Sequence, residues 1–429
     1  MRKQKAKRIV LTMFGSLGDL HPYMALALGL RDRGHEVVIA TSEAYREKIE
    51  GAGLGFFPVR PDLLPPDQAQ EMIARVMDER RGPAYLFKKV LLPYLRESYE
   101  DLMAATEGAD FLVGHVITLA APLVAEKRGL RWASVALQPS IFFSAYDPPI
   151  LQAARWPAWF YGLGIGATRG LLSIVRQVQS AWLRPVGRFR HELGLPARAT
   201  DIDMQVSPYL HLALFSRALA QPQPDWPPQT RQCGFCFYDR LEDGQKLSPQ
   251  IDSFLDAGPP PVTFTLGSSA VMSPGKFYQE SIEAARKLNS RALLLVGADP
   301  GGILSQTLPK GIMAAPYAPY SEVFARSAVI VHQGGVGTTA QALRAGRPQL
   351  VVPFAYDQPD NGARVARRGA GSVISRRRYT AVRAAVEIHA LLIADTVTER
   401  AGYLGDIVRW ENGVSEACHE IEKQLLKGD

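Results

Sequence analysis

Cysteine is scarce in this chain, with three residues in 429. So few thiols exclude a disulfide framework as the source of stability. Cys233 and Cys236 form a C-x-x-C pair, but the chain offers no second ligand pair at matching spacing to complete a zinc site. The pair lies in a strand-like run, residues 233–238, so we predict that both thiols pack inside a core.

Long apolar runs are missing as well. No stretch of 18 apolar residues occurs, which argues against a membrane-spanning helix. The basic start, residues 1–8, leads only into a short strand-like run and lacks the pattern of a signal peptide. We therefore expect a cytoplasmic protein.

Charge of one sign is only slightly in excess. Lys plus Arg number 49 and Asp plus Glu number 42, which gives a net charge of +7. A nucleic-acid-binding protein usually carries a denser basic patch with interleaved aromatics, so we expect no nucleic-acid partner. The excess suits a phosphate-bearing ligand or, at most, weak contact with an anionic membrane surface. Hydrophobic residues make up 47% of the chain, which is typical of a globular protein with full-sized cores.

Short strands of the buried type alternate with helices along most of the chain. The expected strands are 8–14, 37–41, 111–113 and 132–137, followed by 262–266, 292–296, 329–331 and 350–352. The first helix is expected from Pro22 to Arg33. This alternation is typical of α/β domains built on parallel sheets. A proline-rich break at 222–228 divides the pattern into two halves. We predict an N-terminal acceptor-binding domain over 1–219, a linker over 220–230, and a C-terminal nucleotide-sugar-binding domain over 231–407. A final helix over 408–429 is expected to cross back to the N-terminal domain.

The strongest local signal is the glycine turn 334–339 (GGVGTT), which follows a strand of the second half. Backbone N–H groups at a helix start, with hydroxyls beside them, can cradle an anion. The alternative is a tight turn whose glycines serve packing alone. His332 stands at the strand end and could donate a hydrogen bond or a positive charge to a phosphate. Asp357 and Gln358 follow the next strand, where they could grip sugar hydroxyls or form an ordinary surface pair.

The equivalent turn of the first half is residues 15–19 (GSLGD). A dinucleotide-binding fold would place G-x-G-x-x-G here, and an Asp facing a pyrophosphate would repel it. The sequence therefore argues against a nicotinamide enzyme. Asp19 could act as a general base that faces the cleft. It could equally be the N-cap of the helix expected from Pro22.

These blocks resemble those of nucleotide-sugar glycosyltransferases of the two-domain GT-B fold, the family 1 UDP-glycosyltransferases. The likeness is greatest to bacterial members similar to sterol glucosyltransferases and rhamnosyltransferases. The matching blocks are 15–26 (GSLGDLHPYMAL), 317–324 (YAPYSEVF), 332–339 (HQGGVGTT) and 353–358 (PFAYDQ). The resemblance covers nearly the whole chain. It implies two Rossmann-like parallel-sheet domains that face each other across a cleft, and it implies no metal or other cofactor.

The resemblance also assigns a donor site. It implies that Tyr317 stacks on uracil and that Ala318 reads the base through its backbone, although many members carry Trp at the first position. Tyr320 stands where they often have Gln. The residues implied to hold the pyrophosphate are His332, Gly334, Gly335, Gly337 and Thr338. Those implied for the sugar are Asp357 and Gln358, with Asn361 beside them, and those approaching from the two sheet rims are Ser16, Gly18 and Ser268.

The implied reaction moves a sugar, glucose in the first place, from a UDP-sugar to a hydroxyl of a small lipophilic acceptor, with inversion. Plant members carry a catalytic His aligned with Asp19, whereas His21 falls two places later. This alignment favours Asp19 as the base and His21 as a packing or acceptor-side residue. The acceptor, which would be phenolic, terpenoid or sterol-like, is expected against the aromatic stretch 142–182. The residues of this stretch are Phe142, Phe143, Tyr146, Trp156, Trp159, Phe160 and Tyr161, and His115 could reach the same cleft. Their alternative role is ordinary core packing, and for His115 that of a satisfied loop histidine.

Other functions remain compatible with the sequence. A transferase that forms glycolipids at a membrane surface would share the donor site. A sugar-nucleotide epimerase on the same fold would need acid and base groups on both faces of the sugar. A non-catalytic binding protein would have no need of either Asp19 or the Asp357–Gln358 pair.

Overall fold

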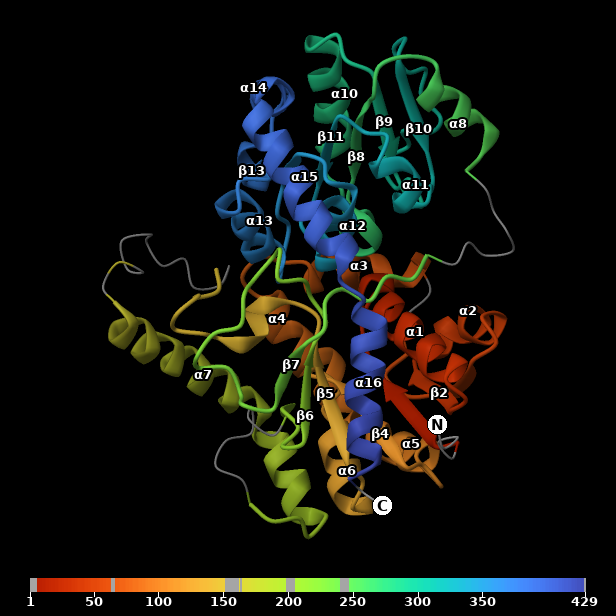
Figure 1. Ribbon diagram of the computed structural model, residues 1–429, viewed down its shortest axis with the longest axis vertical. Helices are drawn as coiled ribbons and strands as arrows, with labels where there is room; N and C mark the ends of the chain where they lie inside the picture. Colours follow the sequence, from red (N-terminus) through yellow and green to blue (C-terminus); the bar gives the residue numbers. More distant parts are fainter. Residues whose placement is uncertain are drawn as a thin grey trace.

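Two sheets form the framework of the molecule, and every strand pairing in them is parallel (Figure 1). The structure is a computed structural model that describes residues 6–62, 66–150, 162, 164–197, 205–239 and 247–427, without the side chains of 66–70. The first sheet has the strand order β3-β2-β1-β4-β5-β6-β7 and the second β10-β9-β8-β11-β12-β13. The predicted pair of Rossmann-like sheets is confirmed.

The first sheet and its helices are built from the N-terminal half. Its strands are β1 (Arg8–Thr12), β2 (Glu36–Thr41), β3 (Gly55–Pro58), β4 (Phe111–His115), β5 (Trp132–Ala136), β6 (Leu210–Ala213) and β7 (Thr230–Gln232). The helical segments are α1 (Leu17–Asp32), η1 (Glu43–Tyr45), α2 (Arg46–Gly51), α3 (Pro66–Val76), α4 (Gly82–Tyr85), η2 (Leu86–Leu91), η3 (Leu92–Tyr94), α5 (Leu95–Ala105), α6 (Ala121–Arg128), η4 (Pro139–Phe142) and α7 (Ile165–Glu192).

The second sheet follows the same plan. Its strands are β8 (Val262–Thr265), β9 (Ala292–Leu295), β10 (Ile312–Ala315), β11 (Val329–His332), β12 (Gln349–Val351) and β13 (Gly371–Val373). The helical segments are α8 (Pro249–Asp256), α9 (Gly267–Ala270), α10 (Phe277–Lys287), α11 (Tyr320–Phe324), α12 (Val336–Ala345), α13 (Gln358–Arg367), η8 (Arg376–Arg378), α14 (Ala381–Ile393), α15 (Asp395–Trp410) and α16 (Gly413–Leu425).

The segment around Cys233 and Cys236 differs from its prediction. Strand β7 ends at Gln232, and the expected strand 233–238 is irregular, with Gly234 at a φ of +99°. Both thiols are buried and unoxidised in the first core, so the predicted packing role is confirmed without the strand. Because β7 pairs with β6, the first sheet extends to Gln232, past the residues predicted as the linker.

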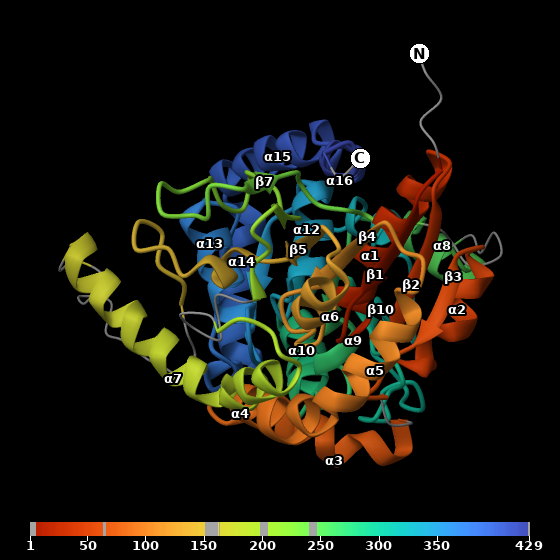
Figure 2. The same cartoon turned by 90° about the horizontal axis from the view of Figure 1, so that it is seen from below.

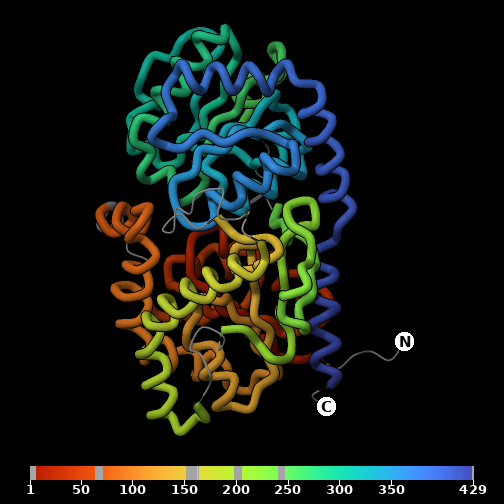
Figure 3. The backbone as a smooth tube through the Cα atoms, turned by 90° about the vertical axis from the view of Figure 1, so that its left-hand side faces the viewer, coloured from red at the N-terminus to blue at the C-terminus, as the bar shows by residue number. Residues whose placement is uncertain are grey.

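The C-terminal helix packs on the first half. Ala417, Cys418, Ile421 and Leu425 of α16 belong to the hydrophobic core that surrounds α1. Figure 3 shows α15 and α16 running along one side of both halves. A further apolar cluster joins the ends of β5 and β6 to α12, α13 and α15. The two halves therefore share packed surfaces.

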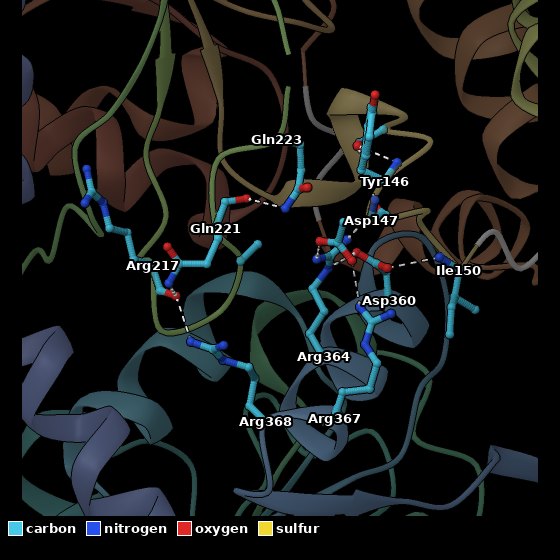
Figure 4. Close-up of polar contacts among 12 residues, drawn as sticks. Tyr146, Asp147, Ile150, Arg217, Gln221, Gln223, Asp360, Arg364, Arg367 and Arg368 are labelled. Carbon is cyan, nitrogen blue, oxygen red and sulfur yellow. Dashed lines mark hydrogen bonds and ion pairs between the residues drawn. The ribbon is translucent and has the colours of Figure 1, made fainter. Parts of the chain in front are cut away.

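Polar contacts tie the loop before residue 150 to α13 of the second half (Figure 4). The buried Arg364 forms ion pairs with Asp147, across the two halves, and with Asp360 at 2.7 Å. The backbone N–H of Ile150 donates to Asp360 at 3.0 Å. These bonds hold α13 of the second half against the loop before residue 150.

None of the helices in the described ranges is long and apolar enough to cross a membrane. Nor does that part of the chain hold a group of three His, Cys, Asp or Glu side chains arranged for a metal ion.

Candidate functional site

A capping box starts the first helix, where the first half of the molecule meets the second. Ser16 is the N-cap, and its Oγ accepts the N–H of Gly18 at 3.3 Å. Asp19 Oδ2 in turn accepts the N–H of Ser16 at 2.8 Å. These reciprocal bonds begin α1 at Leu17. The expectation that the helix begins near Pro22, with Asp19 as its N-cap, is therefore wrong, because Pro22 lies inside α1 and Asp19 is its third residue.

The carboxylate of Asp19 faces the second half of the molecule. Burial raises the pKa of Asp19 to about 6, although hydrogen bonds from Ser16 oppose the rise. Burial, and then the charge of Asp19, raise the pKa of Asp357 to about 7. The same two causes raise the pKa of Tyr356. Tyr356 and Asp357 lie in the loop after β12, in the second half of the molecule. The negative charge of Asp19, in the first half, therefore disfavours ionisation of both side chains.

The starts of three helices meet between the sheets. Ser16 Oγ at the start of α1 lies 3.2 Å from Ser268 Oγ in α9. In the first turn of α12, a Cβ added to Gly337 would lie 3.7 Å from the Cα of Gly18. Four residues assigned to the donor from sequence are thus brought together from the two halves. The N-termini of α1 and α12 carry partial positive charge, so an anion between them would be stabilised.

The glycine turn before α12 is shaped by its close neighbours. Gly334 has a φ of +91°, and a Cβ there would lie 2.6 Å from Val351 and 2.9 Å from the carbonyl oxygen of Gln358. Gly335 is the N-cap of α12. Gln333 donates to Thr338 Oγ1 at 3.4 Å. Packing therefore requires the first glycine, while the backbone N–H groups of the first turn lack intrahelical partners, as an anion site needs.

His332 does not fit the charged phosphate donor expected from the sequence. The side chain is fully buried; its Nδ1 accepts the N–H of Gly334 at 3.1 Å, and Nε2 lies 3.0 Å from Gln349 Oε1. Because Nδ1 accepts, the proton is on Nε2. Burial lowers the pKa of His332 to about 4, which leaves the ring neutral near pH 7. Both ring nitrogens of His332 are hydrogen-bonded within the protein, and the bond from the Gly334 N–H helps to hold the turn in place.

Asp357 and Gln358 organise the loop that faces the first half. Asp357 Oδ2 accepts the N–H of Val336 at 3.1 Å and the side-chain amide of Asn361 at 2.6 Å. Gln358 Oε1 accepts two backbone N–H groups of its own loop, at 2.8 and 2.9 Å. Asp357 is half-buried, and Gln358 is buried.

Tyr317 is the exposed aromatic at the expected place for a nucleobase. Its side chain is 67% exposed, while Ala318 beside it is buried. Tyr320 instead turns inward, where its hydroxyl lies 2.9 Å from Thr265 Oγ1 and its ring stacks on Phe324 at 4.5 Å. Of this pair, Tyr317 is the exposed one.

The aromatic wall expected for the acceptor is partly a core. Phe142 is buried and stacks on Trp226 at 4.0 Å, so its assignment to the acceptor is wrong. Phe143 lies under the guanidinium of Arg176, 5.9 Å from the ring centre. Tyr146 does line a cavity of about 320 Å³, which it shares with Ala145, Pro148, Ile150, Gly164, Ile165, Thr168 and Arg367. Trp156, Trp159, Phe160 and Tyr161 lie outside the described residues.

His115 is buried behind α1. Its ring meets that of Tyr23 edge-on at 6.2 Å, and burial lowers its pKa to about 4. Both ring nitrogens of His115 and the hydroxyl of Tyr23 lack hydrogen-bond partners among the described residues. His115 is therefore not an exposed contact for the acceptor, and it is not a loop histidine whose ring nitrogens are hydrogen-bonded. His21 packs its ring beside Tyr238, at 5.2 Å.

A second, smaller apolar cavity was missed by sequence reasoning. It has a volume of about 30 Å³ and lies at the carboxyl ends of β1 and β4. Its lining includes Met13, Phe14, Val59, Leu91, Leu95, Leu102, Ile117 and Leu119. The helical spacing of the three leucines was the available signal.

Known domains and relatives agree with this geometry. The chain matches the glycosyltransferase family 28 N-terminal domain over residues 9–95 and the erythromycin biosynthesis protein CIII-like C-terminal domain over 284–423. It is 33% identical over 430 residues to the O-mycaminosyltylonolide 6-deoxyallosyltransferase of Streptomyces fradiae, and the match covers 97% of each chain. It is 28% identical over 439 residues to a sterol 3-beta-glucosyltransferase of Arabidopsis thaliana; the match covers 97% of this chain and 66% of that protein.

Solved structures share the fold. The glycosyltransferase of kitacinnamycin superposes with a TM-score of 0.76 at 22% identity, covering 98% of this chain and 100% of that one. The glycosyltransferase VinC, solved in complex with dTDP, gives a TM-score of 0.68 at 21% identity with the same coverage. The chain therefore belongs to the GT-B glycosyltransferases that combine a family 28 N-terminal domain with an erythromycin biosynthesis CIII-like C-terminal domain.

Proposed function

We propose that this glycosyltransferase moves a sugar from a pyrimidine nucleoside diphosphate, UDP-glucose in the first place, to a hydroxyl of a small lipophilic acceptor. The observation that carries the proposal is the meeting of the α1 and α12 starts, with Ser16 and Ser268 in contact. Asp19 and Asp357 each accept one backbone N–H at these helix starts, from Ser16 and Val336. A diphosphate would take further N–H groups of the two first turns, where the helix dipoles favour an anion.

The donor diphosphate would be held by backbone rather than by a charged side chain. Since His332 is neutral and engaged, the N–H groups at the start of α12, from Gly337 and Thr338, take the main part. Their partial charge would also stabilise the leaving nucleoside diphosphate as its negative charge grows. Asp357 and Gln358 would orient the sugar through one carboxylate oxygen and one amide.

The base of the nucleotide would stack on Tyr317. Uracil is the base that the sequence favours, and thymine is a second candidate supported by the relatives. VinC was solved with dTDP, and the spinosyn rhamnosyltransferase SpnG with thymidine diphosphate. Stacking on a tyrosine ring accommodates either base.

Asp19 would act as the general base. Its Oδ2 accepts from Ser16, so the other oxygen would take the proton of the acceptor hydroxyl. The acceptor oxygen then forms a bond to the anomeric carbon as the bond from that carbon to the phosphate oxygen breaks. Attack from the face opposite the diphosphate inverts the configuration. A pKa of about 6 makes this carboxylate a better base than an ordinary Asp while it stays largely ionised near neutral pH.

The acceptor would enter from the first half of the molecule, in the cytoplasm. The cavity of about 320 Å³ beside Tyr146 is lined mainly by apolar residues, whereas the cavity of about 30 Å³ is only about the size of a water molecule. A macrolide-like or sterol-like hydroxyl compound suits such walls, in keeping with the named substrates of the relatives.

A donor–acceptor panel tests the proposal. The protein is incubated with UDP-glucose or TDP-glucose and a set of phenols, sterols and macrolide lactones, with mass spectrometry of the products. We expect nucleoside diphosphate release together with a matching mass gain on one acceptor class. Release without a gain on any acceptor would reject the transfer reaction.

A variant pair tests where the donor binds. Gly337→Val places a branched side chain against Gly18 and should abolish donor binding in calorimetry. Gly402→Val is the matched control, because a Cβ there meets open space. Equal donor affinity in the two variants would move the diphosphate away from α12.

A further inference from the structure

The long helix α7 has an unusual outer face. It has 28 residues and runs along the periphery of the molecule (Figure 2). One side is buried through residues such as Leu171, Leu183 and Phe189. About a third of a turn round the helix from this buried side, apolar residues follow each other at helical spacing and are exposed: Ile174 (60%), Val178 (52%), Ala181 and Pro185. Water-facing positions of an ordinary surface helix are polar, so this face is atypical.

Basic residues flank the apolar stripe on the same helix. Arg169, Arg176, Arg184 and Arg188 are all exposed, and α7 contains no acidic residue before Glu192 at its end. Lys88 of the neighbouring η2 adds another charge and lies 5.7 Å from the ring centre of Trp182. At about 100° per residue, Arg184 and Arg188 lie beside the apolar stripe. Arg169 and Arg176 lie farther round the helix, and Arg176 contacts the Phe143 ring. The inward Arg190 differs, since it is buried and paired with Glu126.

We propose that the outer face of α7 docks on the surface of an anionic phospholipid bilayer. An apolar stripe with basic flanks is the pattern of helices that lie in the plane of the interface, where the stripe enters the acyl boundary and the charges meet lipid phosphates. The first turn of α7, through Ile165 and Thr168, also lines the 320 Å³ cavity beside Tyr146. A lipophilic compound that leaves the bilayer at α7 therefore has an apolar site at the end of the same helix.

Vesicle binding tests the proposal without any donor or turnover, so its failure is distinct from a failure of the proposed function. The full chain is sedimented with vesicles of phosphatidylcholine alone or of phosphatidylcholine mixed with phosphatidylglycerol. We expect binding to the anionic vesicles only. Raising the salt from about 0.1 M to about 1 M shortens the screening length from about 10 Å to about 3 Å and should release most of the protein.

Two pairs of substitutions locate the surface. Arg184→Gln with Arg188→Gln should weaken partition about 25-fold, since each cation near an anionic bilayer contributes about fivefold, or about 1 kcal/mol. Ile174→Ser with Val178→Ser should weaken it as well and reduce the residual binding at high salt. Both pairs are on the surface, and unchanged thermal unfolding would show that the fold survives.

Matched controls come from α14 and the segment before it. Val382→Ser with Val386→Ser removes side chains that are equally exposed, at 62% and 57%, and Arg377→Gln with Arg378→Gln removes two exposed cations. Neither pair should change binding. Equal losses from the α7 and control pairs, or no preference for anionic vesicles, would overturn the proposal, and an acidic protein would then be the better partner for this face.

Discussion

Replacing Asp19 with Asn should make the protein more stable at alkaline pH, because the ionised carboxylate is held in a partly buried place. The pKa rises from an ordinary value of 3.8 to about 6 in the folded protein, mainly through burial. The difference corresponds to about 3 kcal/mol. Asn has nearly the same shape and can still accept the N–H of Ser16, so the capping box is retained.

The sign of the effect with pH follows from the raised pKa. Between about pH 4 and pH 6 the folded protein holds a proton that the unfolded chain has released. Wild-type stability therefore falls as the pH rises through this window, and the Asn variant is spared that loss. We expect similar stability at pH 4 and a gain for Asp19→Asn that reaches about 1–3 kcal/mol by pH 8.

Thermal unfolding at several pH values measures the difference. In a domain of this size, 1 kcal/mol shifts the melting temperature by about 2–4 °C. Asp101→Asn is a control of opposite sign: burial acts against it, but hydrogen bonds from Arg60 lower the pKa of Asp101, so this variant should lose stability at neutral pH. If Asp19→Asn were destabilised at pH 8, or if its effect were the same at pH 4, Asp19 would not be a desolvated carboxylate.

Three other perturbations follow from the same contacts. His332→Ala should lower stability by about 1–3 kcal/mol in urea denaturation and weaken nucleotide binding, because the Gly334 N–H and Gln349 lose a buried partner; unchanged stability and affinity would contradict its role in the turn. Arg364→Met should cost about 3–5 kcal/mol in the same assay, since it strands the fully buried Asp360; a neutral effect would mean that the ion pair adds nothing. The pH profile of kcat/KM should fall below about pH 6, as Asp19 must be ionised to accept a proton, and a profile flat to pH 4 would exclude it.

Eight of the strands that the structure describes were predictable, because buried apolar runs followed by turns are typical of parallel sheets. The strands that escaped prediction have only three or four residues each, which carry little signal: β3, β6, β7, β10 and β13. The start of α1 was misplaced because Pro22 suggests a first turn, whereas the capping box of Ser16 and Asp19 begins the helix earlier. A proline can be accommodated inside a helix when the surrounding structure holds it.

The chemistry of the site was less predictable than the fold. A side chain's charge and exposure depend on residues that are distant in the sequence and pack against it in the structure. The charge state of His332 is set by neighbouring strands and by Gln349, 17 residues later, which the local motif does not contain. Phe142 looked like a free aromatic, but Trp226 covers it from another part of the chain. By contrast, Ser16, Gly18, Ser268 and Gly337 converge as expected, because the carboxyl ends of parallel strands gather their loops at one edge.

The central claim is that the sugar is transferred in the cleft between α1 and α12 with Asp19 as the base. Its most direct test is the transfer rate of Asp19→Asn, measured with saturating donor and an aliphatic alcohol acceptor alongside calorimetric donor affinity. We predict a rate about 10²–10⁴-fold below wild type with donor affinity nearly unchanged, and a much smaller loss for His21→Ala. Full activity in Asp19→Asn, with activity lost in His21→Ala, would contradict the account.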